Sequence, residues 1–466
     1  MRFVHTRWLP LAVSGLVFWS GAVATAETAK KPNPDLKVGR AIYEQHCARC
    51  HGTNGDGAGP DAKRLYPKPR NFTLGTFKFR STASGTPPTD EDLFNVITHG
   101  LPGSGMPAWG GLSDDERWQL VAYVKRFSTT FAERQPELVS LGGDMGFNAA
   151  RYTEGRKLYE QLQCAACHGK WGRADGPSAP TLTDDWNQPI RAANLTQGWT
   201  YRGGDTARDI YLRFTTGIDG TPMPSYADAT SDTERWQLAY YVQSLQETPH
   251  WEMQLRAARA AGALPTSATD PVWQTAPPID MGLSRLTYVQ GDVFAAMVNA
   301  VRMQAVANQE AVVFRLSWDD RTASHSDPPD ALVVSFRPDR LEDEPLAPAD
   351  WYNAPPQTRD FCYWDATLEM AIEGVGAQPP FPVAGAKRVA TTLSSAAAYA
   401  DGRWTLVLRR PLHAELPGAV TFSDRQPTPL SVAVWDGGNN EQGRRGAFST
   451  WIDLVLADEP VHRAHH

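Results

Sequence analysis

The chain has 466 residues, of which 41% are apolar and 21% are charged, and its formal net charge is −7. This length and composition predict two or three globular domains with substantial cores. No block of like charges stands out, so neither nucleic acid nor an anionic membrane surface is indicated as a partner.

The N-terminus has the pattern of an export signal. Arg2 and Arg7 precede the apolar stretch WLPLAVSGLVFWSGAVA, which runs into ATAE. A charged start, an apolar middle and a small-residue site predict a signal peptide over 1–26, cleaved after Ala26, with an uncleaved membrane anchor as the alternative. No later stretch approaches the roughly 20 apolar residues that a spanning helix needs. We therefore expect a periplasmic protein with no membrane span after cleavage.

The next segments along the chain repeat one another. GRAIYEQHCARCHG from Gly39 matches GRKLYEQLQCAACHG from Gly155, and LSDDERWQLVAYVKRF matches TSDTERWQLAYYVQSL. This similarity predicts two tandem copies of one domain, over 35–130 and 150–247. Each copy is expected to begin and end with a helix, the last one capped in the first copy by Ser113.

The amino-acid pattern changes after the second copy. HWEMQLRAARAAGALP, at 250–265, predicts a helix followed by a linker. Beyond it, AVVFRLSW, ALVVSFRP, RWTLVLRRPL, LSVAVWDG and STWIDLVLA are short runs rich in β-branched and aromatic residues, separated by turn residues. These runs predict the strands of an all-β sandwich or barrel. The fold class is therefore multidomain, with two all-α domains followed by a β-sandwich domain.

Each copy of the repeat contains one Cys-x-x-Cys-His-Gly cluster. This is the attachment signature of c-type haem, because two thiols three residues apart on a helical turn reach the two vinyl groups of one porphyrin. The following imidazole is then presented to the iron. A structural zinc site is the alternative, but it explains neither the histidines nor the downstream methionines. The predicted covalent attachment residues are Cys47, Cys50, Cys164 and Cys167, and the predicted iron ligands are His51 and His168.

A Met-Pro pair follows each histidine at the same distance. Met106 lies 55 residues after His51, and Met223 lies 55 residues after His168. Both methionines stand in loops rich in glycine and proline. A thioether sulfur is a soft ligand that suits haem iron, so we predict that Met106 and Met223 are the sixth ligands. With both axial positions filled, the pattern favours electron transfer over oxygen or peroxide chemistry.

Each repeat resembles a class I cytochrome c domain. The resemblance rests on the N-terminal helix with its glycine and tyrosine, Cys-x-x-Cys-His-Gly, the Met-Pro loop, and a last helix with Trp-x-x-x-x-Tyr. It implies covalently bound haem c in both copies, with the ligands named above. Arg80 and Arg202 are further candidates, as partners of haem propionates; the alternative is that both are solvated.

The last third, over 268–458, resembles the haem-binding domain of ethylbenzene dehydrogenase-type γ subunits, best in VAVWDGGNNEQGRRGAFSTWIDLVL. That resemblance implies a β-sandwich with a b-type haem held by a methionine and a lysine, beside a molybdenum enzyme. Here NAPPQTRDFCYWD contains no methionine, and GRRGAFSTW contains no lysine. We therefore expect a docking domain without haem b, and two haems c in all. The unpaired Cys362 is predicted to be a buried, unreactive thiol on a strand.

These observations predict a periplasmic dihaem c-type cytochrome that is not itself an enzyme. It would carry single electrons in a respiratory chain or for a redox protein partner, such as a molybdenum oxidoreductase or a terminal oxidase. Two alternatives stay open. One is a γ-type subunit with a third haem, of b type. The other is a dihaem peroxidase, which needs one iron with a vacant or displaceable ligand.

Overall fold

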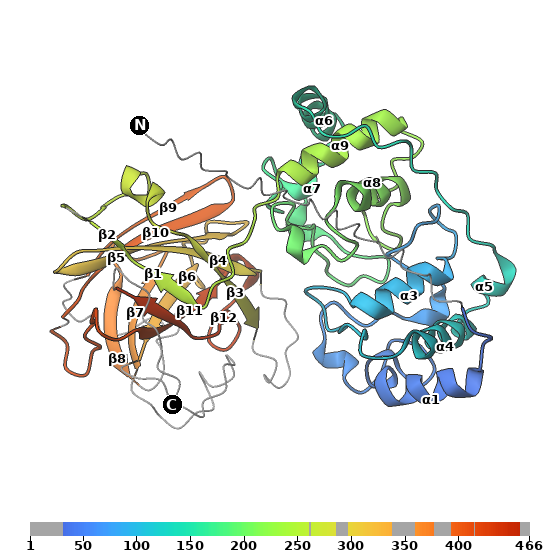
Figure 1. The fold of residues 1–466 in the computed structure, drawn as a ribbon, viewed down its shortest axis with the longest axis horizontal. Helices are drawn as coiled ribbons and strands as arrows, with labels where there is room; N and C mark the ends of the chain where they lie inside the picture. Colours follow the sequence, from blue (N-terminus) through green and yellow to red (C-terminus); the bar gives the residue numbers. More distant parts are fainter. Residues whose placement is uncertain are drawn as a thin grey trace, which may run out of the picture.

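The computed structural model describes residues 31–260, 262–285, 297–337, 359–376, 393–413 and 415–456. The predicted signal peptide lies outside these residues. Two helical domains are followed by a domain of strands, and in Figure 1 the strand domain lies to the left of the two helical domains, with the second above the first. Over the described ranges, we find no helix that combines the length and the apolar character needed to cross a membrane.

The two helical domains contain corresponding elements. The first has α1 (Leu36–His46), α2 (Ala48–His51), α3 (Asp90–His99), α4 (Asp114–Val124) and α5 (Thr130–Glu133). The second has α6 (Ala149–Gln161), α7 (Ala165–His168), α8 (Ala207–Thr216) and α9 (Asp232–Ser244). The predicted first and last helices of each repeat are therefore present.

Side-chain caps start the later helices. Ser113 caps α4 and Ser231 caps α9, each in a reciprocal capping box with the glutamate three residues on. Thr89 and Thr206 cap α3 and α8 in the same way, with an aspartate at the third position. The sequence analysis did not anticipate α3 and α8, although the Thr-x-x-Asp spacing marks their start.

The first and last helices of each repeat cross at a glycine. A Cβ on Gly39 would lie 2.3 Å from the carbonyl oxygen of Gln119 in α4, and one on Gly155 would lie 2.1 Å from that of Gln237 in α9. These distances are shorter than van der Waals contact. Only glycine therefore lets the two helix backbones approach this closely.

The C-terminal domain consists of strands, as predicted. They are β1 (Gln254–Arg256), β2 (Ala258–Arg259), β3 (Ile279–Arg285), β4 (Ala300–Ala307), β5 (Ala311–Asp319), β6 (Ala331–Phe336), β7 (Arg359–Asp365), β8 (Ile372–Gly376), β9 (Ser394–Ala400), β10 (Arg403–Pro411), β11 (Thr428–Trp435), β12 (Ala447–Ser449) and β13 (Ile452–Val455).

One local prediction was wrong. The segment 250–265, expected to be helical, contains β1 and β2. β1 pairs in parallel with β13, and β2 pairs in parallel with β4. Alanine and arginine are good helix formers, but intrinsic propensity is a weak preference, and backbone pairing with β13 and β4 overrides it here.

The strands form two layers that are connected by hydrogen bonds. The pairing order is β8-β7-β6-β11-β12-β3-β4-β5-β10-β9. β3 connects the layers, because its first half pairs with β4 and its second half pairs with β12. Side chains of β5 and β10 in one layer and of β6 and β11 in the other share one buried core. The domain is thus a sandwich whose layers join along β3.

Candidate functional site

Both Cys-x-x-Cys-His clusters occupy a single helical turn. α2 ends at His51, and α7 ends at His168. The Nδ1 atom of His51 lies 2.9 Å from the carbonyl oxygen of Arg70, and that of His168 lies 2.9 Å from the carbonyl oxygen of Ala193. A carbonyl oxygen only accepts, so Nδ1 carries the proton in both rings. The lone pair therefore lies on Nε2, which is the arrangement that a metal-binding histidine needs.

The turn that follows each histidine is fixed by a tyrosine. Tyr43 in α1 donates from its hydroxyl to the carbonyl oxygen of Gly52 at 2.7 Å, and Tyr159 in α6 does the same to Gly169 at 2.7 Å. Both glycines have a φ of 77°, which side chains rarely adopt. The glycine and the tyrosine of the repeat signature thus hold the histidine turn in place.

None of the four cluster cysteines, all of which lie among the described residues, forms a disulfide. Burial raises the pKa of the Cys47 thiol to about 12 and that of the Cys164 thiol to about 11.

The methionines stand in loops of matching backbone. The carbonyl oxygen of Met106 accepts from the amide of Leu101 at 3.0 Å, and that of Met223 accepts from Ile218 at 3.0 Å. The amide of each methionine donates to a hydroxyl two residues earlier, at 3.2 Å in both loops. Both methionine side chains are half-buried.

This donor set fits a c-type haem in each repeat. The structure places two thiols and one imidazole on a single turn, twice, and orients each imidazole through its Nδ1 atom. The soft thioether sulfur in the matched loop completes the set that a low-spin haem iron takes. The apolar side chains of the repeats, including Phe72 beside the His51 ring at 4.5 Å, give that group an apolar surrounding.

The two predicted propionate arginines connect the repeats instead. The guanidinium of Arg80 is fully buried, bonds the carboxylate of Asp219 at 2.7 Å and donates to the carbonyl oxygen of Thr216 at 2.9 Å. Arg202 donates back to the carbonyl oxygens of Pro102 and Gly103, both at 3.2 Å. Each arginine thus reaches the methionine loop of the other repeat. The interpretation of Arg80 as a propionate partner was wrong, because Asp219 already neutralises it.

Three cations, Arg70, Lys78 and Arg202, lie at the same interface, and of these only Arg202 was predicted as a site residue. Burial, with the nearby charges of Arg70 and Arg202, lowers the pKa of Lys78 to about 8. Among the described residues, neither Lys78 nor Arg202 forms an ion pair within 4.0 Å. Half-buried cations without a close carboxylate fit an anionic group such as a haem propionate.

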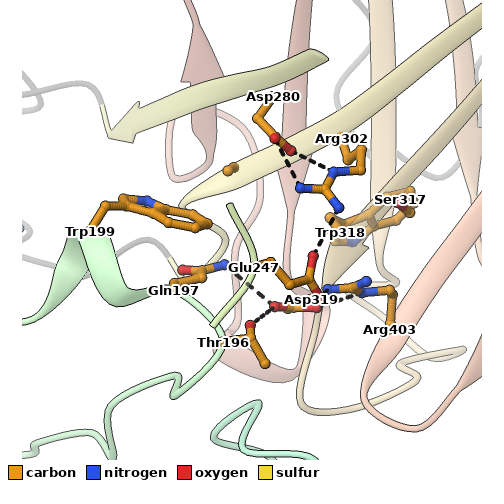
Figure 2. Close-up of a pocket in the computed structure, with 11 residues that line it drawn as sticks. Thr196, Gln197, Trp199, Glu247, Asp280, Arg302, Ser317, Trp318, Asp319 and Arg403 are labelled. Atoms are coloured by element: carbon orange, nitrogen blue, oxygen red, sulfur yellow. Dashed lines mark hydrogen bonds and ion pairs between the residues drawn. The ribbon is translucent and has the colours of Figure 1, made fainter. Parts of the chain in front are cut away.

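The second repeat is fixed to the strand domain by a polar cluster (Figure 2). Asp319, at the end of β5, accepts from Arg403 at 2.7 Å and from Asn194 at 2.7 Å. Glu247, which follows α9, bonds Arg403 at 2.7 Å and Arg302 at 3.1 Å. The cluster therefore joins two segments of the second repeat to strands β4, β5 and β10.

This junction is continuous with the second histidine turn. Asn194 directly follows Ala193, whose carbonyl oxygen holds His168. Arg191, in the same loop, donates to the side-chain oxygen of Asn439 at 2.8 Å. The loop that orients His168 is thus anchored on the strand domain, whereas His51 is oriented by Arg70 in its own repeat.

The remaining predicted residues lie in the strand domain. Cys362 is on β7 and is 1% exposed, and burial raises the pKa of its thiol, so it is the buried thiol that the sequence predicted. The interior beside it is filled by side chains, among them the neighbouring rings of Trp318, Trp364 and Trp404.

Comparisons with known families agree with this division. Residues 34–124 match the family described as cytochrome c oxidase, cbb3-type, subunit III, and residues 152–246 match the cytochrome c family. Residues 358–447 match the ethylbenzene dehydrogenase family. The chain therefore contains two cytochrome c domains followed by an ethylbenzene dehydrogenase-like domain. Such cytochrome domains imply covalently bound haem c and serve as electron carriers.

The chain is similar to proteins whose names describe them as subunits or parts of larger complexes. The putative respiratory nitrate reductase haem subunit ORF7 of Haloferax mediterranei is 25% identical over 204 residues, which is 42% of this chain and 70% of the relative. The chlorate reductase γ subunit of Ideonella dechloratans is 26% identical over 214 residues, 44% of this chain and 86% of the relative. A chain of the Kuenenia stuttgartiensis reducing HAO-like protein complex is 44% identical, covering 46% of this chain and all of that chain, with a TM-score of 0.45.

Proposed function

We propose that this protein is a periplasmic dihaem cytochrome that carries single electrons to or from an oxidoreductase complex. The observation that carries the proposal is the pair of histidines, each fixed through Nδ1 at 2.9 Å with Nε2 free for iron. The proposed covalent attachments are Cys47 and Cys50 in the first repeat and Cys164 and Cys167 in the second. The proposed sixth ligands are Met106 and Met223.

The haem supplies reversible one-electron chemistry, and the chain's own residues do the rest. The carbonyl oxygens of Arg70 and Ala193 hold the histidines, and the helices exclude water from one side of each site. A histidine and a methionine together favour the reduced iron and leave no coordination position for peroxide. The arginines that cross between repeats fix the two methionine loops relative to each other.

The likeness to nitrate and chlorate reductase subunits supports a partner of the molybdenum-enzyme type, and the match to a cbb3-type family supports a terminal oxidase as the second candidate. The strand domain is proposed as the docking module. It carries the second cytochrome domain rigidly, through the Asp319 cluster, and its core is filled by its own aromatic side chains.

The test uses single replacements of the two methionines in the full mature protein. Met106→Ala and Met223→Ala should each lower the midpoint potential of one haem, by roughly 100 mV, and leave the other unchanged, because axial ligation sets the potential. Spectroelectrochemical titration measures both potentials. Unchanged potentials and an unchanged low-spin spectrum in both variants would overturn the ligand assignment.

The haem count is a separate measurement. A pyridine haemochrome assay should find two c-type haems per chain. A clear b-type signal would favour the three-haem alternative, and turnover of peroxide by the wild-type protein would favour the peroxidase. Copurification from the native host, followed by metal analysis for molybdenum, identifies the partner.

A further inference from the structure

Three carboxylates that are not among the predicted haem residues meet at one end of the strand domain. Asp320 follows β5, Asp330 precedes β6 and Asp436 follows β11. β6 and β11 are antiparallel neighbours in which Ala331 faces Trp435, so Asp330 and Asp436 lie side by side. Asp320 comes from the opposite layer. One oxygen atom from each carboxylate lies within 4.8 Å of the others, and all three residues are buried.

Backbone and side-chain N–H groups hold these carboxylates in position. Asp330 accepts from the amides of Gly437 at 2.8 Å and Ser324 at 2.7 Å, and from the indole of Trp404 at 3.0 Å. The Oδ1 atom of Asp436 accepts from Asn439 at 3.0 Å. The cluster is therefore built by two turns and an aromatic side chain rather than by a flexible surface.

One oxygen in this cluster has no partner. The Oδ1 atom of Asp320 accepts from the amide of Thr322 at 3.1 Å, but its Oδ2 atom meets no donor in the described chain. Asp320 is only 2% exposed. An unsatisfied, buried carboxylate oxygen costs about 1–3 kcal/mol or more. The site is therefore short of a donor or a cation at the point where the carboxylates converge.

The local charges are also unbalanced. Glu441 is fully buried beside the cluster, and the side-chain amide of Asn439, the backbone amide of Met297 and that of Asp436 satisfy its oxygens. The guanidinium groups of Arg191 and Arg321 act on Asp436. These four carboxylates outnumber the two guanidinium groups. Burial and the charges of Asp436 and Asp330 raise the pKa of Asp320, and burial raises the pKa of Glu441 to about 8.

We propose that Asp320, Asp330 and Asp436 bind one calcium ion. All three donors are hard carboxylate oxygens, which exclude soft metals. A closed, buried site favours Ca²⁺ over Mg²⁺, because Mg²⁺ keeps several of its waters and demands near-octahedral geometry. The two positive charges of the ion balance the local excess. The rival explanation is that the carboxylates share a proton.

The position of the ion gives it a structural role. It joins the loop after β5 in one layer to the ends of β6 and β11 in the other. The residue before Asp320 is Asp319, which accepts from Asn194, and Asn439 of the same turn as Asp436 accepts from Arg191. The ion therefore stabilises the face on which the loop of the second histidine is anchored.

The test compares the full mature protein with Asp320→Asn, and with Asp327→Asn as the matched control. Asp327 lies in the same loop and is exposed. Metal analysis of the wild-type protein should find one calcium per chain. After treatment with EGTA, calorimetry should show a Tm that falls by several degrees and returns with added CaCl₂. Asp327→Asn should behave like the wild type, and Asp320→Asn should show no response to calcium.

The outcomes separate the explanations. If wild-type protein neither contains calcium nor responds to it, the carboxylates share a proton and the proposal is wrong. An equal calcium response in Asp320→Asn would place the ion elsewhere, and an equal response to MgCl₂ at the same concentration would overturn the choice of calcium. If Asp320→Asn is at least as stable as the wild-type protein when both are measured in EGTA, the variant is folded. None of these measurements uses the haem spectra, so the result is independent of the proposed function.

Discussion

The two cytochrome domains are built alike but are surrounded differently. Each orients its histidine through a backbone carbonyl, fixes the next turn with a tyrosine and packs its outer helices at a glycine. In the first domain the loop that orients His51 lies against the second repeat, where the hydroxyl of Tyr66 donates to the carbonyl oxygen of Pro189 at 2.7 Å. The second has its loop bound to Asp319 of the strand domain. The two repeats therefore have the same local geometry around the histidine, and the contact with the third domain distinguishes the second site from the first.

The surroundings of the two sites decide whether the two haems have different reduction potentials. The proposed axial ligands are the same in both domains, so a difference in potential must come from charge, burial and rigidity around each site. The second domain contacts the first domain through Arg80 and the strand domain through Asp319. Its histidine loop moves only if the strand domain moves with it.

The largest expected effect concerns the contact between the two cytochrome domains. Asp219→Ala removes the carboxylate that pairs with the fully buried Arg80. An uncompensated buried charge costs about 3–5 kcal/mol, and we expect that loss in urea unfolding followed by helical circular dichroism. Asp228→Ala, at an exposed position of the same domain, is the control. Equal unfolding midpoints in the two variants would show that the crossed arginines do not stabilise the pair.

A somewhat smaller effect is expected at the junction with the strand domain. Asp319→Ala removes the acceptor of Arg403 and Asn194 and should cost about 2–4 kcal/mol, because a partly buried, charge-assisted network is broken. The potential of the second haem should shift while that of the first stays constant, as measured by redox titration. Asp401→Ala, at an exposed position nearby, serves as the control. A shift of both potentials would contradict an effect confined to the second domain.

The glycine crossings test whether the two repeats are equivalent inside. Gly39→Ala and Gly155→Ala each place a Cβ within 2.3 Å or less of a carbonyl oxygen of the facing helix. Overpacking of this kind costs about 1–3 kcal/mol, and thermal unfolding should show similar losses in both variants. A loss in only one repeat would mean that the other repeat relaxes by separating its helices.

The smallest effect is expected at the helix caps. Ser113→Ala and Ser231→Ala each remove a reciprocal capping box. Each should cost about 1 kcal/mol, and the two values should agree because the cap geometry is the same. Chemical denaturation measures both, with the conservative Ser→Thr variants expected to recover most of the loss. Clearly unequal values would mean that neighbouring domains change the local caps.

Most of the fold could be predicted from local sequence patterns. The outer helices, their caps and the strands depend on neighbours within about four residues, so periodicity and residue type reveal them. The repeat is visible as the similarity of two stretches of sequence. The segment at 254–259 escaped because its conformation is imposed by β4 and β13, which follow much later in the chain. The helices α3 and α8 were missed although their Thr-x-x-Asp capping boxes were visible.

The sequence by itself determined the chemistry of the cytochrome domains, because Cys-x-x-Cys-His places three donors on one helical turn. Tertiary structure alone decided what surrounds them. In the folded protein Arg80 pairs with Asp219, and Lys78 lies near Arg70 and Arg202. The loop of His168 is bound to Asp319. Tertiary structure also gathered Asp320, Asp330 and Asp436 from two sheet layers. Contacts between residues a hundred or more positions apart depend on how domains pack, and no local pattern encodes them.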